Sequence, residues 1–285
     1  TYYSRIFKKC EKCYNLHTCS TCLLEKNNKL GKKLYITGKG RCNITNACDI
    51  EDLFRNVVTN SKFLYGAFYT FSNYDLIQFF EELGSKTKIE RGNRVFPESD
   101  KSSDVISALS KELNRLHVDI RFEQEVDHIL LENNTFKGVV IKNNTDILYG
   151  DKIIIATGGL SYKATGSTGD GFEFAKSIGH AITKCNPSLV PMNVKEIGVV
   201  KELQGLSLKN IEINITSKKK EIYRDFGELL FTHFGVSGPV ILSSSSYCIP
   251  YMDNKDLVLS IDLKPALTTE QLDERVLRDF GEFSN

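Results

Sequence analysis

Residues 23–46, LLEKNNKLGKKLYITGKGRCNITN, constrain the fold most, because an acid, a cationic cluster and a Gly-x-Gly turn follow an apolar run. The run ends at Glu25, as a parallel strand of a doubly wound sheet would, and an acid at that strand tip commonly holds ribose hydroxyls. Dinucleotide folds also carry a glycine-rich turn roughly 20 residues before this acid. Residues 1–22 contain no glycine. The segment predicts a nucleotide diphosphate site that lacks the usual preceding turn.

The composition indicates a soluble globular protein of two domains. The chain has 285 residues, of which 41% are hydrophobic and 26% are charged, and its net charge is +1. Single cores rarely exceed roughly 250 to 300 residues. The small net charge argues against a general nucleic-acid or membrane-surface binder. No apolar stretch approaches the roughly 18 residues of a membrane span, and no signal peptide is evident, so we expect a cytoplasmic protein with reduced cysteines.

The N-terminal cysteines offer the main alternative function. Cys10 and Cys13 form one CxxC pair, Cys19 and Cys22 form another, and His17 lies between them. Zinc knuckles usually leave a dozen or more residues between such pairs, whereas five intervene here. We therefore favour an incidental N-terminal segment, and keep a zinc-binding interaction module or a non-catalytic remnant as the alternative.

Periodicity predicts helices followed by strands in the first part of the chain. Apolar residues recur at helical spacing over 74–83, with Gly84 as a C-terminal cap, and over 103–116, with Ser102 or Ser103 as the N-cap. The runs 118–122, 126–131, 136–142 and 147–149 are typical of strands. Asparagine pairs at 133–134 and 143–144 supply turns, so these strands are expected to form a small antiparallel meander.

A second glycine-rich segment spans residues 152–171, KIIIATGGLSYKATGSTGDG. Its β-branched run, 153–155, predicts a central parallel strand buried on both faces. Small residues at the end of such a strand let a flat or charged cofactor lie against the backbone. The later glycines lead into a helix with Asp170 near its N-terminus. Tight turns alone would also explain an isolated cluster of glycines.

The last third is expected to be mostly β. The strand candidates are 208–215, 221–226, 229–232 and 257–263, and a helix is expected to start on Gly238 and Pro239. Thr268 and Gln271 form a capping box for a final helix. For His233 a packed or hydrogen-bonded structural role is favoured over that of a proton donor. No Ser-His-Asp set, carboxylate pair or HExxH motif is present, which is consistent with chemistry carried by a cofactor.

The motifs ITGKGRCNITN, IIIATGG, TGSTGDG, PSLVPMNV and GELLFTHFGVSGPVIL, in this order, resemble those of the BaiN/YhiN-type flavoproteins. These are NAD(P)/FAD-dependent oxidoreductases related to dehydro-bile-acid reductases and aminoacetone oxidases. The resemblance implies an α/β fold in which a Rossmann-like FAD-binding domain is split by a mostly β insert. It implies FAD as cofactor, NAD(P)H as electron donor and reduction of an activated C=C, or oxidation of a small amine or ketone.

The resemblance also assigns cofactor-binding residues, with Glu25 on the adenosine ribose and Arg41 near the pyrophosphate. The full set is Glu25, Lys26, Lys33, Gly38, Gly40, Arg41, Cys42, Asn43, Val126, Ala156, Thr157, Gly158, Gly159, Gly169 and Asp170. The expected partner is a small-molecule substrate, without nucleic acid or membrane. We expect a Cys-rich segment over 1–22, an incomplete FAD domain over 23–187 and an insert over 188–285. Both ends are expected to be cut, which could leave this fragment inactive.

Overall fold

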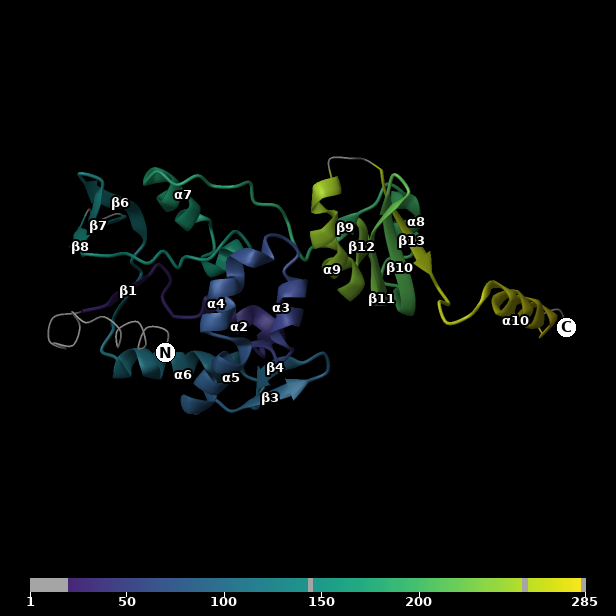
Figure 1. Cartoon of the computed structure of the whole chain (residues 1–285), viewed down its shortest axis with the longest axis horizontal. Coiled ribbons are helices and arrows are strands. Elements are labelled where there is room, and N and C mark those ends of the chain that lie inside the picture. The colour runs from purple at the N-terminus through teal and green to yellow at the C-terminus, as the bar shows by residue number, and fades with distance from the viewer. Residues whose placement is uncertain (1–19, 143–145, 253–255, 283–285) are drawn as a thin grey trace. The chain divides into compact units, whose positions relative to one another are not determined.

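The structure is a computed structural model that describes residues 20–142, 146–252 and 256–282 (Figure 1). It divides into two compact units, Thr1–Thr183 and Lys184–Asn285. The first unit contains β1 (Cys22–Glu25), α2 (Lys32–Ile36), η2 (Thr37–Gly40), β2 (Thr45–Asn46), α3 (Ile50–Asn56), η3 (Ser61–Leu64), α4 (Tyr65–Thr70), α5 (Asn73–Glu82), β3 (Thr87–Glu90), β4 (Arg94–Pro97), α6 (Ser102–Arg115), β5 (Asp119–Phe122), β6 (Val126–Glu132), β7 (Thr135–Ile141), β8 (Ile147–Tyr149), η4 (Lys163–Thr165) and α7 (Asp170–Ser177).

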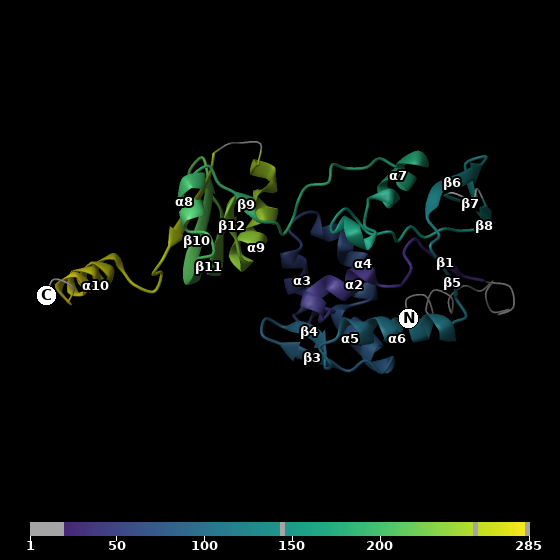
Figure 2. The same cartoon turned by 180° about the vertical axis from the view of Figure 1, so that it is seen from behind.

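Strand β1 pairs in parallel with β5, with Glu25 opposite Phe122 at its C-terminal end. Both labels lie together when the molecule is seen from behind (Figure 2). The expectation that residues 118–122 belong to the antiparallel meander is therefore wrong. Helix α6 precedes β5 and reverses the chain, so β5 returns alongside β1 in the parallel direction instead of forming a hairpin with β6.

The rest of the expected meander is confirmed. Strands β6, β7 and β8 pair antiparallel in that order, and they pack Ile129, Val139 and Ile141 against Phe174 and Ile178 of the α7 region. Both Asn133 and Asn134 adopt positive φ, as a two-residue hairpin turn requires. The pair Asn143 and Asn144 lies outside the described residues.

The two expected helices are present as α5 and α6. Helix α5 starts on a capping box between Ser72 and Asp75, and Gly84 follows it at a φ of 80°. The expected serine cap of α6 is wrong, because its N-cap is Lys101. Ser102 is the first helical residue, and its hydroxyl donates instead to the carbonyl of Tyr35 at 3.3 Å.

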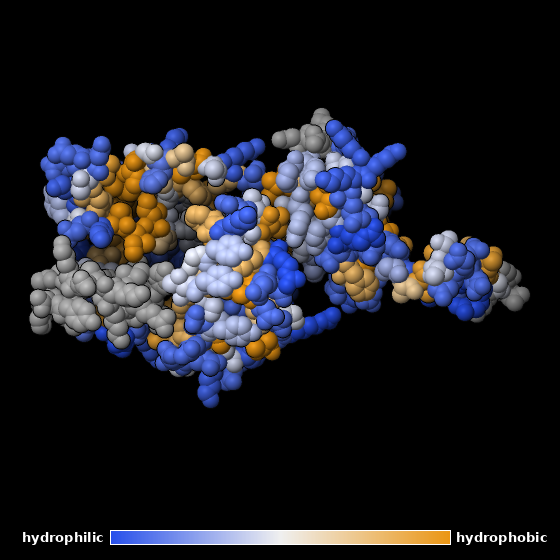
Figure 3. All heavy atoms as spheres, viewed as in Figure 1, coloured by the Kyte–Doolittle hydropathy of each residue, from blue (hydrophilic) through white to orange (hydrophobic). Residues whose placement is uncertain are grey.

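The prediction of a buried strand over residues 153–155 is also wrong. No helix or strand occurs between Tyr149 and Lys163, all of which are described, and Ile154 is 66% exposed. Propensity favours an extended backbone, but a strand also needs a hydrogen-bonding neighbour, and in the described part of the chain β1 is paired with β5 alone. Hydrophobic side chains accordingly gather on the surface near β6 and α7 (Figure 3).

The second unit contains β9 (Met192–Asn193), α8 (Ile197–Glu202), β10 (Ser207–Ser217), β11 (Lys220–Thr232), β12 (Gly235–Ser237), α9 (Pro239–Cys248), η5 (Ile249–Tyr251), β13 (Leu257–Asp262) and α10 (Thr269–Glu282). Its sheet is antiparallel, in the order β13-β10-β11-β12-β9. One face packs on α9 through fully buried Ile213, Leu229 and Ile241.

The mostly β character expected for this region is confirmed. The expected strands 221–226 and 229–232 are in fact one strand, β11, because Gly227 stays in register opposite Ile211. The expected capping box of α10 is confirmed, since Gln271 N–H donates to Thr268 Oγ1 and the Thr268 N–H donates to Gln271 Oε1. Within the ranges that the structure describes, no helix is both long and apolar enough to cross a membrane.

Candidate functional site

The tip of β1 contacts the loop that precedes α7. Lys26 Nζ lies 2.6 Å from Asp170 Oδ2 and 2.5 Å from Thr168 Oγ1, and Thr168 Oγ1 donates to Asp170 Oδ1 at 2.7 Å. Lys26 and Asp170 were both singled out from the sequence, and the fold brings them together. Thr168 was missed, although its place inside TGSTGDG was a usable signal.

Asp170 is held as a carboxylate at this point. Burial alone would raise its pKa, but hydrogen bonds from Lys26 and Thr168 outweigh that effect and lower the pKa below its ordinary value. Asp170 also lies in the first turn of α7, where a negative charge interacts favourably with the helix dipole. Lys26 is therefore neutralised by a partner of its own chain.

Glu25 occupies the strand tip that the sequence predicted. Its Oε1 accepts the backbone N–H of Asn27 at 2.8 Å and the Asn27 amide at 2.7 Å. The Asn27 amide also donates to the carbonyl of Thr165 at 3.2 Å, which fixes the β1 tip to the same glycine loop. Within the described part of the chain, Glu25 Oε2 makes no hydrogen bond, so it remains able to accept from hydroxyl groups of a ligand.

Helix α2 carries a second cation to the glycine-rich segment. Lys33 Nζ donates to the carbonyl and the hydroxyl of Ser161, at 2.6 and 3.1 Å, and lies 4.8 Å from the ring centre of Tyr162. Unlike Lys26, Lys33 forms no ion pair with a carboxylate among the described residues. Its charge is therefore available to an anionic ligand.

The glycines of this segment permit close approaches. Gly158 has a φ of 77°, and a Cβ there would lie 2.9 Å from Ser167 Oγ. At Gly171 a Cβ would lie 2.5 Å from Thr157 Oγ1, so residues 157–158 and 167–171 lie side by side. Gly169, with a φ of 92°, is the N-cap of α7. Ala156, Thr157 and Gly158 are exposed and Gly159 is half-buried, which leaves their backbone open to a ligand.

The loop after α2 forms a separate cluster. Gly38, Lys39, Gly40 and Cys42 all have positive φ, and a Cβ on Gly38 would lie 2.9 Å from the backbone N of Asn43. The Cys42 side chain is 2% exposed, and burial raises the pKa of its thiol. It is therefore a packed neutral thiol. In its favoured orientation the Asn43 amide donates to the carbonyls of Val95 and Thr45.

Arg41 is engaged by its own chain. Its guanidinium is hydrogen-bonded to Glu90 and Asp100, with Nε 2.7 Å from Asp100 Oδ1, and lies 4.1 Å from the ring centre of Phe96. Hydrogen bonds from Lys88 and Arg41 lower the pKa of Asp100 below its ordinary value. Sequence reasoning missed both carboxylates, because they follow Arg41 by 49 and 59 residues. No hydrogen bond or ion pair joins Arg41 to Gly158 among the described residues, although Lys33 of α2, the helix that precedes the Arg41 loop, contacts Ser161 and Tyr162 of the glycine-rich segment.

The remaining candidates divide as follows. Val126 is the first residue of β6, and both Val126 and Leu24 of β1 pack against the core of the meander.

His233 is exposed and packs edge-on against Phe234. Cys10, Cys13, His17 and Cys19 lie outside the described residues, and no group of metal-binding side chains occurs in the part that is described. The zinc hypothesis therefore stays untested.

Comparisons of the sequence with known proteins give one family match and several curated relatives. The family described as "HI0933-like protein Rossmann domain" matches residues 10–243, which is most of the chain. A 3-dehydro-bile acid delta(4,6)-reductase of Clostridium scindens is 30% identical over 88% of this chain and 59% of its own length. Ribosomal RNA dihydrouridine synthases of Escherichia coli and Haemophilus influenzae are each 27% identical over 60% of their length, and the matches cover 87% and 88% of this chain. The chain thus spans about three fifths of these relatives.

Solved structures show weaker likenesses. An open conformation of a flavocytochrome c3 fumarate reductase has a TM-score of 0.36 and 17% identity, covering 71% of this chain and 49% of its own. L-proline dehydrogenase from P. horikoshii has a TM-score of 0.25 and 14% identity, covering 68% of this chain and 56% of its own. At these scores neither structure carries an argument about the site.

Proposed function

The chain belongs to the HI0933-like Rossmann-domain family, and from this premise we propose that it binds FAD and passes hydride from NAD(P)H to a substrate. One observation carries the proposal: the tip of β1 meets the glycine-rich loop before α7, through Lys26 and Asp170. Ligands of open α/β sheets bind at strand C-termini beside helix N-termini, and both are present here. Bound flavin would supply the hydride-transfer chemistry, while the protein supplies position and charge.

The residues at this edge fit the nucleotide half of FAD. Glu25 offers Oε2 to ribose hydroxyls, and Lys33 offers an ammonium that no carboxylate of the described residues neutralises. The exposed backbone of residues 156–158 can lie against a flat or charged group, since its side chains are small. Lys26 fits less well as a phosphate ligand, because Asp170 already holds it. The same reasoning applies to Arg41, which Glu90 and Asp100 hold.

We propose an activated carbon–carbon double bond as the acceptor. One relative is named a delta(4,6)-reductase of a bile acid and two are named dihydrouridine synthases, and both names describe saturation of a ring double bond. A small-molecule acceptor is the better proposal for this chain, because a net charge of +1 provides little general attraction for RNA.

Flavin binding tests the cofactor. We expect purified protein, after incubation with FAD and gel filtration, to retain a flavin absorption spectrum, and Glu25→Gln and Lys33→Gln to weaken FAD binding roughly tenfold each. The control Lys111→Gln, an exposed lysine of α6, should bind FAD normally. Folded protein, judged by circular dichroism, that takes up no FAD at high concentration would contradict the proposal.

Anaerobic reduction tests the donor and the acceptor. FAD-loaded protein is mixed with NADH or NADPH, and bleaching of the flavin identifies the donor. Reoxidation is then followed with a conjugated unsaturated steroid ketone and, separately, with uridine-containing RNA. We expect the ketone to restore the oxidised spectrum. Reoxidation by RNA alone would overturn the small-molecule part of the proposal and leave the flavin part intact.

A further inference from the structure

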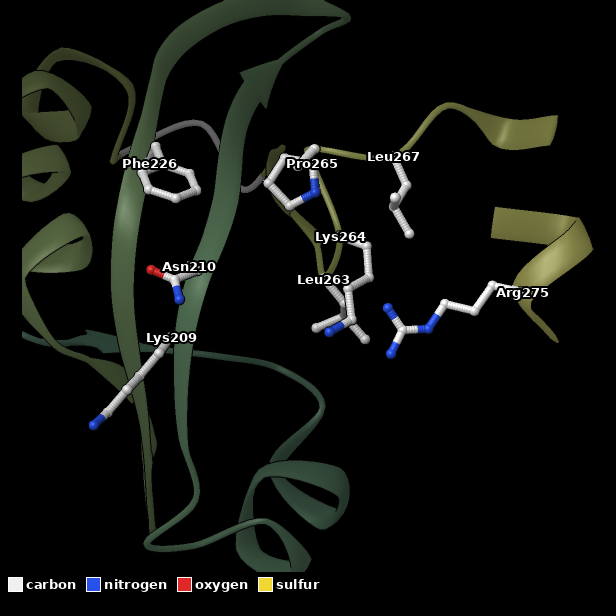
Figure 4. A pocket seen from close by; sticks show the side chains of 9 residues that line it. Lys209, Asn210, Phe226, Leu263, Lys264, Pro265, Leu267 and Arg275 are labelled. Atoms are coloured by element: carbon white, nitrogen blue, oxygen red, sulfur yellow. The ribbon is translucent and has the colours of Figure 1, made fainter. Parts of the chain in front are cut away.

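The second unit contains a concave site of its own. A cavity of about 290 Å³ lies between β10, β11 and the segment that leads from β13 into α10 (Figure 4). This volume is near the lower end of the range for small-molecule sites, roughly 300 to 1,000 Å³. All of its lining residues belong to Lys184–Asn285, so the cavity is separate from the cluster at the β1 tip.

A backbone irregularity shapes one wall of this cavity. The register of β10 with β11 shifts between Leu208 and Ile211, which places Lys209 and Asn210 in a bulge. Asn210 has a φ of 55°, in the left-handed region that asparagine adopts more readily than most residues other than glycine. Bulges redirect side chains and recur beside functional sites. Here the bulge forms part of the cavity wall, and the Lys209 side chain extends away from Lys264 and Arg275 (Figure 4).

The cavity is cationic. Lys209, Lys264 and Arg275 line it, and Figure 4 shows Arg275 extending from α10 toward Lys264. Neither lysine forms an ion pair among the described residues, and Arg275 has only a long contact to Asp279, with 3.8 Å between Nε and Oδ2. The nearby Asp262 accepts the backbone N–H of Lys264 through Oδ1. Cations that face one another repel, so an anion between Lys264 and Arg275 would be stabilised.

The cavity also exposes apolar side chains. Phe226 is 58% exposed and Leu263 is 57% exposed, although both adjoin a sheet whose other face is well packed. An exposed aromatic ring beside cations is a platform on which a nucleobase can stack, and such stacking contributes roughly 1 to 3 kcal/mol per base. A guanidinium can bind phosphate through two parallel hydrogen bonds.

We propose that this cavity binds a nucleotide, with the base against Phe226 and the phosphate between Lys264 and Arg275. The pairing of a flat apolar surface with adjacent cations is the chemistry that a nucleoside monophosphate complements. The inference does not depend on the proposed flavin site, because no lining residue belongs to that site.

Calorimetric titration of the whole chain with AMP, adenosine and inorganic phosphate tests the proposal. We expect AMP to bind at least tenfold more tightly than either adenosine or phosphate, and more weakly as salt rises. Lys264→Gln and Arg275→Gln should each weaken AMP binding at least fivefold, and Phe226→Ala should weaken both AMP and adenosine. Lys201→Gln, which removes an exposed charge from α8 of the same unit, is the matched control and should leave binding unchanged.

Equal affinity for AMP and adenosine would overturn the phosphate assignment. Unchanged AMP binding in both Lys264→Gln and Arg275→Gln would overturn the location, as would an equal loss in Lys201→Gln. AMP is also one half of FAD, so AMP added in the titration can bind at the proposed flavin site near the β1 tip. The titration is therefore repeated with Glu25→Gln, which weakens that site. Persistence of AMP binding in that variant separates this cavity from the proposed flavin site, and its loss there would count against the inference.

Discussion

Lys26 Nζ lies 2.6 Å from Asp170 Oδ2. The two residues are 144 positions apart in the chain, and their ion pair joins the two glycine-containing segments to which they belong. Both side chains are less than one third exposed, at 23% and 29%. The pair therefore lies between the weak pairs of open surfaces and fully buried ones. It ties the end of β1 to the start of α7, the two elements that define the candidate site.

We expect Lys26→Met and Asp170→Asn each to lower the free energy of unfolding by about 1 kcal/mol. The double variant should lose little more than either single variant, because the interaction is already absent after one substitution. Urea unfolding followed by circular dichroism measures all three. Lys111→Met, on the exposed face of α6, controls for loss of a positive charge. Additive losses would show that the two residues act independently.

The stabilisation from Asp170 should depend on pH. Its pKa in the folded protein is lowered from the ordinary 3.8, because bonds from Lys26 and Thr168 outweigh burial. The folded state therefore favours the carboxylate, so the contribution is complete above pH 3.8 and disappears as the pH falls through the lowered value. We expect the difference in unfolding free energy between the wild type and Asp170→Asn to be full at pH 7 and to shrink at pH 3. A difference that stays constant across this range would exclude the ionic origin.

Alanine substitutions at three glycines distinguish the energetic cost of a left-handed backbone from the cost of steric crowding. Gly158 has a φ of 77° and a close neighbour in Ser167, Gly179 has a φ of 95° in open space, and Gly159 has neither constraint. A left-handed conformation costs an L-residue roughly 1 to 2 kcal/mol. We expect alanine to destabilise most at Gly158, less at Gly179 and least at Gly159, as measured by chemical denaturation. Equal effects at Gly158 and Gly159 would mean that the turn at Gly158 can relax.

Local signals predicted much of the fold correctly. The glycine that follows α5 and the capping box of α10 both act within a few residues, so the sequence displays them directly. The capping box between Ser72 and Asp75 at the start of α5 is equally local, but it was not predicted. The acid at the tip of β1 was equally visible. The cap of α6 was the exception, since Ser102 bonds to Tyr35 instead of to its own helix.

Contacts between distant segments were not readable in the same way. Arg41 was expected near phosphate groups because its motif resembles that of a flavoprotein family. Nothing close to Arg41 in the sequence indicated that its guanidinium would form ion pairs with Glu90 and Asp100. The isoleucine run at 153–155 was expected to be buried because of its composition. Burial depends on which strands lie beside it, and the described sheet places only β5 next to β1.

The Arg41 network leads to a prediction about the loop from Gly38 to Cys42. Arg41 contacts two carboxylates and the ring of Phe96, so it holds this loop against the hairpin of β3 and β4. We expect Arg41→Ala to lower the free energy of unfolding and Arg41→Lys to restore less than half of that loss, because lysine lacks the planar fork of the guanidinium. Hydrogen exchange of the backbone amides of Lys39 and Arg41 should become faster. If Asp100→Asn costs as much in the Arg41→Ala protein as in the wild type, the carboxylate does not act through Arg41.

The last prediction compares Ile154, which is 66% exposed, with Ile213 of β10, whose side chain is fully buried in the core of the second unit. Replacing a buried isoleucine with threonine removes apolar contacts and buries a hydroxyl, so Ile213→Thr should cost about 2 to 4 kcal/mol. Ile154→Thr should change the unfolding free energy by less than about 0.5 kcal/mol, as is usual for exposed positions. Denaturant unfolding of the two variants, each read from its own unit by nearby fluorescence labels, gives the comparison. A large loss of unfolding free energy in Ile154→Thr would mean that residues 153–155 are buried in solution, in agreement with the buried strand that the sequence predicts.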